Sequence, residues 1–242
     1  MKIKDNSILI TGGATGIGFA LAKAFVEEGN YVTICGRRKD KLMEAKDKIP
    51  QLHAVTCDIS KAEERECLHD LVDVNILINN AGILRMIDLR KGLPSLNGEN
   101  EIETNLVAPI QLSTAYIPSL LKHEESAIIN ITSGLAFVPM AAAPIYCATK
   151  AAMHSFSLSL RYQLRNTVIK VFEVLPPIVD TELYKEARNE LKNRSIPPSE
   201  VAKATLKALQ WDEYEVAVGM AKDLKTGSRN NPEQTFLGIN GI

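Results

Sequence analysis

The chain has 242 residues, of which 45% are hydrophobic and 24% are charged, and its formal net charge is −1. This length suits one large α/β domain spanning residues 1–242, with enough apolar side chains for a core. The near-neutral charge and the lack of a long basic run exclude the electrostatic pattern of a nucleic-acid-binding protein.

The cysteines and the N-terminal residues indicate the cellular compartment in which we expect the protein. The four cysteines, at 35, 57, 67 and 147, form neither a C-x-x-C pair nor a cluster with histidines. We therefore expect no disulfide framework and no metal site. No signal-peptide pattern opens the chain, and no stretch approaches the ~18 apolar residues of a membrane span. We expect a cytoplasmic protein that does not bind membranes.

Strand-like apolar runs alternate with helical segments along the chain. Strands are expected at 7–11, 31–35, 52–56, 74–79, 127–132, 168–175 and 215–218. Helices are expected at 17–28, 39–48, about 64–72, about 99–122, 145–165 and 200–210. Pro109 is a candidate for a kink in the fourth helix, because proline removes a backbone donor.

This alternation predicts the fold class. Continuous apolar strands separated by helices indicate a parallel sheet that is covered on both faces. We therefore expect an α/β Rossmann fold, a doubly wound parallel sheet of about seven strands with helices on both faces. The loosest stretch follows the sixth strand, and we interpret about 178–198 as a substrate flap rather than a domain boundary. The pattern assigns no element to 222–242.

A glycine-rich turn joins the first strand to the first helix. It reads Thr11-Gly12-Gly13-Ala14-Thr15-Gly16-Ile17-Gly18. Glycines permit a tight turn and the close approach of a pyrophosphate, whose charge suits the free N–H groups of a helix N-terminus. The position in the first strand-turn-helix unit favours a dinucleotide site, with Thr11, Gly12, Thr15, Gly16, Ile17 and Gly18 as its candidate residues. The alternative is a glycine-rich turn that binds nothing.

The end of the second strand bears on the choice between NAD and NADP. NAD-binding folds commonly place Asp or Glu there to hold the ribose diol. This chain has Gly36 followed by Arg37 and Arg38, and a guanidinium suits a 2′-phosphate. The sequence favours NADP, with NAD possible; alternatively, the arginines merely open a basic helix.

Tyr146 and Lys150 are spaced to share one face of a helix. An ammonium beside a phenol stabilises the phenolate, so the phenol becomes a proton donor that works near neutral pH. Ser133 ends the fifth strand, at the edge where open α/β sheets bind ligands. The alternative is a surface Tyr-Lys pair, which occurs often by chance.

Together these motifs resemble those of the short-chain dehydrogenase/reductase (SDR) family, of the classical type. The resemblance covers residues 7 to 181 and is carried by several motifs in order: Thr11 to Gly18, Asp58, Asn79-Asn80-Ala81-Gly82, Asn105, Ser133, Tyr146-x-x-x-Lys150, and Pro176 to Thr181. Segments after Ser133 and Tyr146 resemble a narrower bacterial subgroup, the DltE-like oxidoreductases. Pro176-Pro177 departs from the Pro-Gly that is usual in the family.

The resemblance implies an NAD(P)(H)-dependent oxidoreductase that transfers a hydride between nicotinamide and a small-molecule carbonyl or secondary alcohol. It implies a homodimer or homotetramer. The implied catalytic residues are Asn105, Ser133, Tyr146 and Lys150. The further implied cofactor contacts are Asp58, Asn79, Ala81, Gly82, Tyr146, Lys150, Pro176, Ile178 and Thr181.

Two other classes of protein remain as alternatives. A nucleotide-sugar epimerase or dehydratase usually has a different glycine spacing and a larger C-terminal substrate region. A non-catalytic NADP-binding sensor is the other alternative, although such a protein need not keep both Tyr146 and Lys150.

Overall fold

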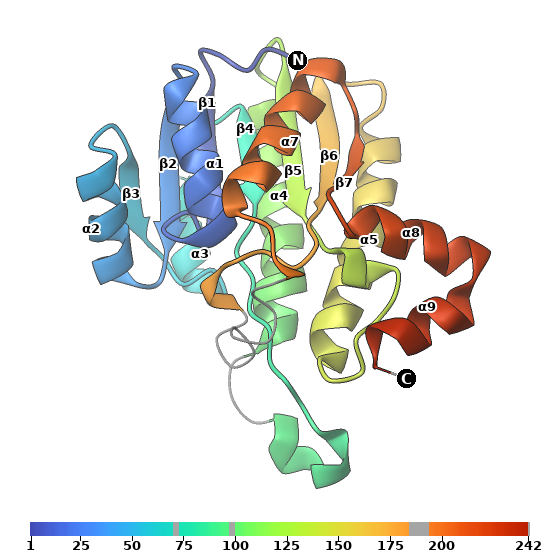
Figure 1. Cartoon of the computed structure of the whole chain (residues 1–242). Helices are drawn as coiled ribbons and strands as arrows, with labels where there is room; N and C mark the ends of the chain where they lie inside the picture. The colour runs from blue at the N-terminus through green and yellow to red at the C-terminus, as the bar shows by residue number, and fades with distance from the viewer. Residues whose placement is uncertain (70–72, 97–99, 184–193, 242) are drawn as a thin grey trace.

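A seven-stranded sheet, parallel throughout, forms the centre of the molecule in the computed structural model, which describes residues 1–69, 73–96, 100–183 and 194–241 (Figure 1). Its strand order is β3-β2-β1-β4-β5-β6-β7. The strands are β1 (Ser7–Thr11), β2 (Tyr31–Gly36), β3 (His53–Thr56), β4 (Ile76–Asn79), β5 (Ser126–Ile131), β6 (Ile169–Leu175) and β7 (Glu215–Ala217). The predicted doubly wound sheet is confirmed.

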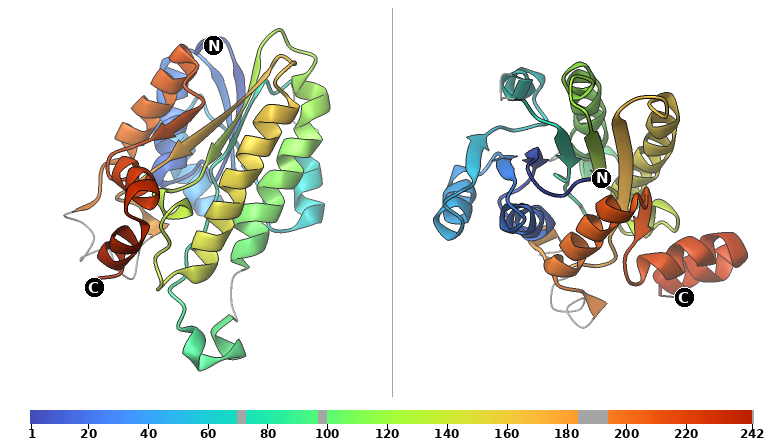
Figure 2. Two further views of the ribbon diagram at one scale, coloured as in Figure 1. Left: turned by 90° about the vertical axis from the view of Figure 1, so that its right-hand side faces the viewer. Right: turned by 90° about the horizontal axis from the view of Figure 1, so that it is seen from above.

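Helices cover both faces of this sheet (Figure 2). One face carries α1 (Gly16–Glu27), α2 (Lys39–Lys48) and α7 (Pro198–Trp211). The other carries α3 (Ala62–His69), α4 (Ala108–Leu120) and α5 (Pro144–Gln163). Neighbouring strand residues alternate between the two cores: Ile8 and Ile10 pack on the first face, and Leu9 packs on the second. Burial on both faces explains why the central strands are mostly apolar on both sides.

The strand order also creates the crevice that positions the site. From β1 the chain winds outward through β2 and β3, then crosses to β4 on the other side of β1 and winds outward again. In open α/β sheets, ligands bind at the carboxyl ends of the strands where the winding reverses. Here that point lies between β1 and β4.

The fourth helical segment differs from the expectation. Its start is a π-helix, η3 (Glu103–Val107), which leads into α4. Pro109 lies in a helical stretch that runs without a break from 101 to 120, and it has no N–H to donate to the Asn105 carbonyl four residues earlier. The kink predicted at Pro109 stays a prediction. The π-helix lies one turn earlier and surrounds Asn105.

The remaining segments are short or peripheral. Two 3₁₀ helices, η1 (Leu89–Lys91) and η2 (Leu93–Leu96), lie on an arm that projects below the sheet in Figure 1, and η4 (Gly134–Ala136) follows β5. The unassigned tail forms α8 (Ala221–Asn230) and α9 (Pro232–Ile239). None of the helices in the described part of the chain has the length and apolar character needed to cross a membrane.

Candidate active site

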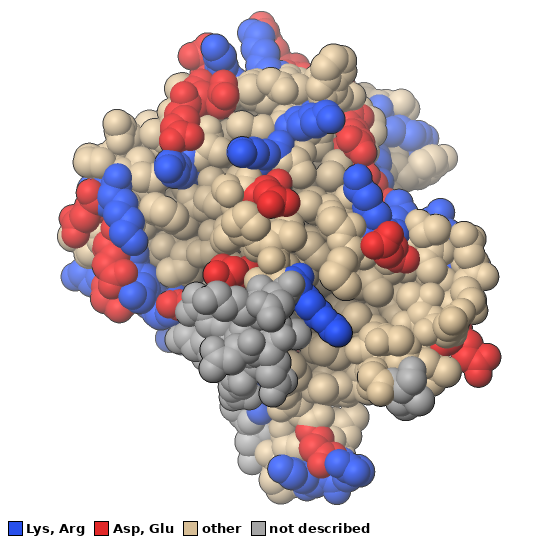
Figure 3. Space-filling model, viewed as in Figure 1, with Lys and Arg blue, Asp and Glu red and all other residues tan. Residues whose placement is uncertain are grey.

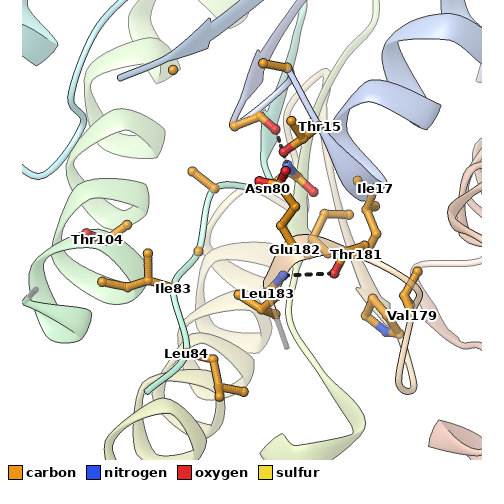
Figure 4. A pocket seen from close by; sticks show the side chains of 18 of the residues that line it. Thr15, Ile17, Asn80, Ile83, Leu84, Thr104, Val179, Thr181, Glu182 and Leu183 are labelled. Atoms are coloured by element: carbon orange, nitrogen blue, oxygen red, sulfur yellow. Dashed lines mark hydrogen bonds between the residues drawn. The ribbon is translucent and has the colours of Figure 1, made fainter. Parts of the chain in front are cut away.

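A pocket of about 410 Å³ opens at the carboxyl ends of the central strands (Figure 4). The predicted site residues that line it are Gly12, Thr15, Gly16, Ile17, Arg37, Arg38, Asp58, Ala81, Gly82, Ser133, Tyr146, Lys150, Pro176 and Thr181. The predicted residues that do not line it are Thr11, Gly18, Asn79, Asn105 and Ile178. The structure thus brings most of the candidate residues together and places the rest behind them.

The glycine turn has the shape of a phosphate cradle. Gly12 has φ +63°, and a Cβ on it would stand 2.8 Å from the Ala81 Cα. Gly16, with φ +55°, begins α1, whose N-cap residue Thr15 makes no side-chain cap hydrogen bond. The first N–H groups of α1 are therefore left for a ligand, and a pyrophosphate fits this arrangement.

Two residues hold the turn in place. The Thr11 hydroxyl oxygen accepts hydrogen bonds from the backbone N–H groups of Asn80 (3.0 Å) and Ala81 (3.1 Å). The Asn80 side chain donates to the carbonyls of Thr11 (2.9 Å) and Gly12 (3.1 Å). A Cβ on Gly18 would overlap the Gly12 carbonyl oxygen. Thr11 and Gly18 therefore shape the cradle, although they do not line the pocket.

The arginine pair lies at the end of β2 with two acidic neighbours. Arg38 donates to Glu182 at 2.7 Å and to the Thr15 hydroxyl at 3.4 Å. Burial raises the pKa of Asp58, but hydrogen bonds from Ser60 and the charge of Arg37 together hold it below its usual value. The ionised Asp58 and the two guanidinium groups border the same end of the pocket.

Ser133, Tyr146 and Lys150 are all buried and all line the pocket. The Lys150 Nζ donates to the Ile131 carbonyl at 2.8 Å and lies 5.6 Å from the centroid of the Tyr146 ring. The Ser133 Oγ accepts from the Leu135 N–H at 3.1 Å. Burial lowers the pKa of Lys150 to about 8, and the charge of Glu173 opposes this effect. An ammonium of lowered pKa beside a phenol is suited to moving protons near neutral pH.

Asn105 lies within the π-helix and behind Gly82. Its Oδ1 accepts from the Ile83 N–H at 2.9 Å, and its Nδ2 donates to the Ile83 carbonyl at 2.8 Å and to the Thr149 hydroxyl at 3.3 Å. A Cβ on Gly82 would lie 3.4 Å from the Asn105 Oδ1 and 3.7 Å from the Lys150 Nζ. Asn105 is therefore near Lys150 and fixes the backbone that leads out of the pocket.

Asn79 and Ile178 also have contacts away from the pocket. The buried Asn79 amide donates to the Ser113 hydroxyl and to the Asn130 Oδ1, which ties β4 to α4 and β5. Ile178 accepts at its carbonyl from the Ile196 N–H. Of the predicted flap at 178–198, residues 184–193 lie outside the described residues. On its described part, Thr181 accepts at its hydroxyl from the Leu183 N–H.

Sequence reasoning missed several residues that line the pocket. Ile83, Leu84 and Leu183 give one end an apolar lining, while Thr15 and Asn80 lie at the other end (Figure 4). Leu84 and Leu183 also pack against the cluster that contains Tyr146. No local pattern marks Ile83 or Leu84, because they meet the pocket only through the fold. Leu183 and Glu182 lie in the predicted flap at 178–198, but the pairing of Glu182 with Arg38 could not be predicted, because the two positions are 144 apart.

Comparison with known proteins shows the class. The short chain dehydrogenase family matches residues 6–192, and the chain belongs to that family. It is an NAD(P)-dependent oxidoreductase with the Rossmann fold, as the motifs predict. The epimerase alternative is not favoured. Such an enzyme usually has a larger C-terminal substrate region, whereas in the described residues the helices and strands after β6 are α7, β7, α8 and α9.

Particular relatives support the same family. The chain is 43% identical over 248 residues to the uncharacterized oxidoreductase DltE from Bacillus subtilis (strain 168), covering 99% of this chain and 98% of that one. A short chain dehydrogenase from Burkholderia cenocepacia J2315, solved in complex with NADP, has a TM-score of 0.87 at 28% identity, with 99% of each chain covered. One from Burkholderia phymatum, in complex with NAD, shares the fold with a TM-score of 0.85 at 20% identity, covering 100% of this chain and 98% of that one.

Proposed function

We propose that this protein interconverts a small apolar carbonyl compound and its alcohol with NADP(H), using Ser133, Tyr146 and Lys150. The observation that carries the proposal is that these three side chains line the same 410 Å³ pocket as the glycine turn and the arginine pair. The bound nicotinamide supplies or accepts the hydride. The protein must therefore orient the substrate and move one proton.

Tyr146 is the proposed proton donor to the substrate oxygen in reduction and the acceptor in oxidation. The Lys150 ammonium, held by the Ile131 carbonyl, stabilises the phenolate that Tyr146 becomes. Ser133 accepts from the Leu135 N–H, so its own hydroxyl proton is the one it offers to the substrate oxygen. Asn105 holds the Ile83 backbone beside Lys150, and we assign it the positioning of a water that connects Lys150 to solvent.

The residues that line the pocket indicate how the protein would hold the cofactor. The N–H groups at the start of α1 and the turn around Gly12 would hold the pyrophosphate. Arg37 and Arg38 would hold a 2′-phosphate, which is why we favour NADP over NAD. NADP is also the ligand of the Burkholderia cenocepacia relative. Pro176 and Thr181 would border the nicotinamide.

The apolar end of the pocket bears on the substrate. Leu84 and Leu183 pack against the cluster that contains Tyr146, and Ile83 lies next to them in the pocket (Figure 4). Apolar walls with a few polar groups favour a ligand that carries hydrocarbon next to its reacting oxygen. We therefore propose a ketone or aldehyde with an apolar substituent as the substrate of a single domain, with the segment 178–198 as its substrate flap.

The test is a screen of NADPH consumption against ketones, aldehydes and ketoacids, followed by Tyr146→Phe. This change removes the proton donor, so turnover is expected to fall by about 10²–10⁴ while NADPH binding remains nearly unchanged. Tyr162→Phe is the matched control, since Tyr162 lies on the same helix and is 67% exposed. Full activity in Tyr146→Phe would remove Tyr146 from the mechanism. A wild type that binds NADPH but reduces nothing would favour the sensor alternative.

We also propose a cytoplasmic homo-oligomer that assembles through α4 and α5. Leu158 and Tyr162 leave exposed apolar surface on α5, and the four thiols are free, as suits a reducing compartment. On the face drawn in Figure 3, basic side chains stand among acidic ones, which does not favour nucleic acid as a partner. Light scattering of wild type and Tyr162→Glu tests the oligomer, which the glutamate is expected to weaken.

A further inference from the structure

A carboxylate is buried in the sheet directly behind the proposed catalytic groups. Glu173 lies in β6, in the otherwise largely apolar run of Ile169–Leu175, and is 0% exposed. Burying a charge costs free energy unless the charge is paired and hydrogen-bonded. The partners of Glu173 therefore indicate why the fold keeps it.

Both oxygens of Glu173 are used. Its Oε1 accepts from the Thr132 hydroxyl at 2.7 Å, and its Oε2 lies 2.8 Å from the His154 Nδ1. Thr132 immediately precedes Ser133, and His154 lies one helical turn beyond Lys150 on α5. Glu173 also acts electrostatically on Lys150. One buried carboxylate thus connects the neighbours of two proposed catalytic residues.

The charges around Glu173 come from three elements. Lys150 and His154 face it from α5, Glu215 lies on β7, and Lys225 lies on α8. Lys225 forms an ion pair with Glu215, which supplies that carboxylate with its counter-charge. His154, Glu173 and Glu215 are close enough together to suggest metal ligands, but the Lys225 ammonium already brings a positive charge there. Glu173 is left to be balanced by His154 and Lys150.

Of Lys150, Glu173 and His154, only His154 reaches solvent. Its side chain is 20% exposed, and the Phe137 ring packs on it with the two ring centroids 4.6 Å apart. The hydrogen bond that His154 donates to Glu173 raises the pKa of His154, whereas burial opposes that rise. The carboxylate therefore favours the charged form of the imidazole.

We propose that Glu173 and His154 are positioning residues that set the protonation of the Tyr146–Lys150 pair, and that His154 is the group through which solvent pH reaches it. This inference rests on the proposed function. The Glu173 carboxylate favours the charged form of Lys150. A proton on His154 neutralises Glu173 and withdraws part of that support. The two residues therefore act on Lys150 in opposite directions, which a merely structural pair would not do.

The first experiment needs no turnover. Histidine NMR signals are followed against pH in the full chain, for wild type, Glu173→Gln and Lys150→Met, with His154→Gln assigning the signal. Glu173→Gln is expected to lower the titration midpoint of His154, because its anionic partner is lost. Lys150→Met is expected to raise it, because Glu173 then supports His154 alone. An unchanged midpoint in Lys150→Met would overturn the coupling.

The second experiment is the pH profile of NADPH-dependent reduction. Removing the negative charge with Glu173→Gln lets the Tyr146–Lys150 pair lose its proton more easily, so the alkaline limb moves to lower pH by on the order of one unit. His154→Gln removes the share of positive charge that His154 still carries at that pH, so it moves the limb to higher pH, by less than Glu173→Gln moves it down. The proposal is contradicted if neither variant moves the alkaline limb, or if both variants move it in the same direction.

The two experiments distinguish a failure of the proposed coupling from a failure of the proposed function. A wild type that reduces no carbonyl would refute the proposed function, while the NMR titration would still decide the coupling. Should Glu173→Gln fail to fold, Lys150→Met in the titration and His154→Gln in the pH profile test the same coupling without it.

Discussion

Arg38 is a proposed ligand of the NADP 2′-phosphate, and it also pairs with a residue of the proposed flap. Its guanidinium pairs with Glu182 at 2.7 Å, and the two side chains are 41% and 37% exposed. A pair this exposed contributes only about 0–1 kcal/mol. A 2′-phosphate, with a larger negative charge, should displace Glu182 from Arg38. We therefore expect Glu182 to weaken NADPH binding without preventing it.

We predict that Glu182→Gln tightens NADPH binding by up to about fivefold and changes NADH binding less, because only NADPH carries the 2′-phosphate. Arg37→Ala should do the opposite and weaken NADPH far more than NADH. Fluorescence titration of both nucleotides measures this. Glu27→Gln is the matched control, since its ion pair with Lys23 stands at the C-terminal end of α1 and neither residue lines the pocket. Equal changes for NADPH and NADH would refute recognition of the 2′-phosphate.

Site residues that lie in local motifs could be predicted from the sequence, whereas residues defined by partners distant in the chain could not. Ser133 and Tyr146 could be predicted to share a pocket, because each lies in or next to a motif at the carboxyl edge of a parallel sheet. Glu173 could not, since Thr132 and His154 come from other elements. The only signal was one carboxylate within the apolar run of β6, and a run of that kind is buried on both faces.

Among the elements, the first turn of α1 depends on a close approach that only glycine allows. A Cβ on Gly18 would overlap the Gly12 carbonyl oxygen and stand 2.5 Å from the Asn80 Nδ2. Gly238 in α9 has no atom within 4 Å of such a Cβ. The two helical glycines therefore differ in the space around them.

Gly18→Ala is expected to destabilise the fold by about 1–3 kcal/mol and to weaken NADPH binding, because α1 must move away from the turn. Gly238→Ala should be neutral or stabilise by up to about 1 kcal/mol. Urea unfolding and NADPH titration measure both effects. If the two variants behave alike, packing at the turn does not shape the cofactor site.

Element boundaries were predictable where the sequence period is strong, as in α2 and β1. The irregular start of the α4 segment was not. Pro109 indicated an irregularity in this segment, but it could not show that the irregularity takes the form of a π-helix that ends two residues before it. The π-helix instead puts Asn105 against Ile83, and that register depends on a loop from another strand. The apolar pocket wall was hidden for the same reason.

At the scale of the whole molecule, the buried ammonium of Lys150 lowers the free energy of unfolding. Burial lowers its pKa from 10.5 to about 8 in the folded protein. Below pH 8 the folded protein therefore carries the cost of a buried charge, about 3 kcal/mol. Between pH 8 and 10.5 the unfolded chain holds more protons than the folded one, so this cost is relieved as the pH rises.

Lys150→Met removes the charge and also the hydrogen bond to Ile131, which contributes about 1 kcal/mol. We predict an inactive variant that is more stable than wild type by about 2 kcal/mol at pH 7, as measured by urea unfolding. The advantage should shrink as the pH rises from 8 to 10.5. Lys207→Met, at an exposed position of α7, should show no such trend. A Lys150→Met variant whose advantage is the same at every pH would mean that the buried ammonium is not what costs the fold its stability.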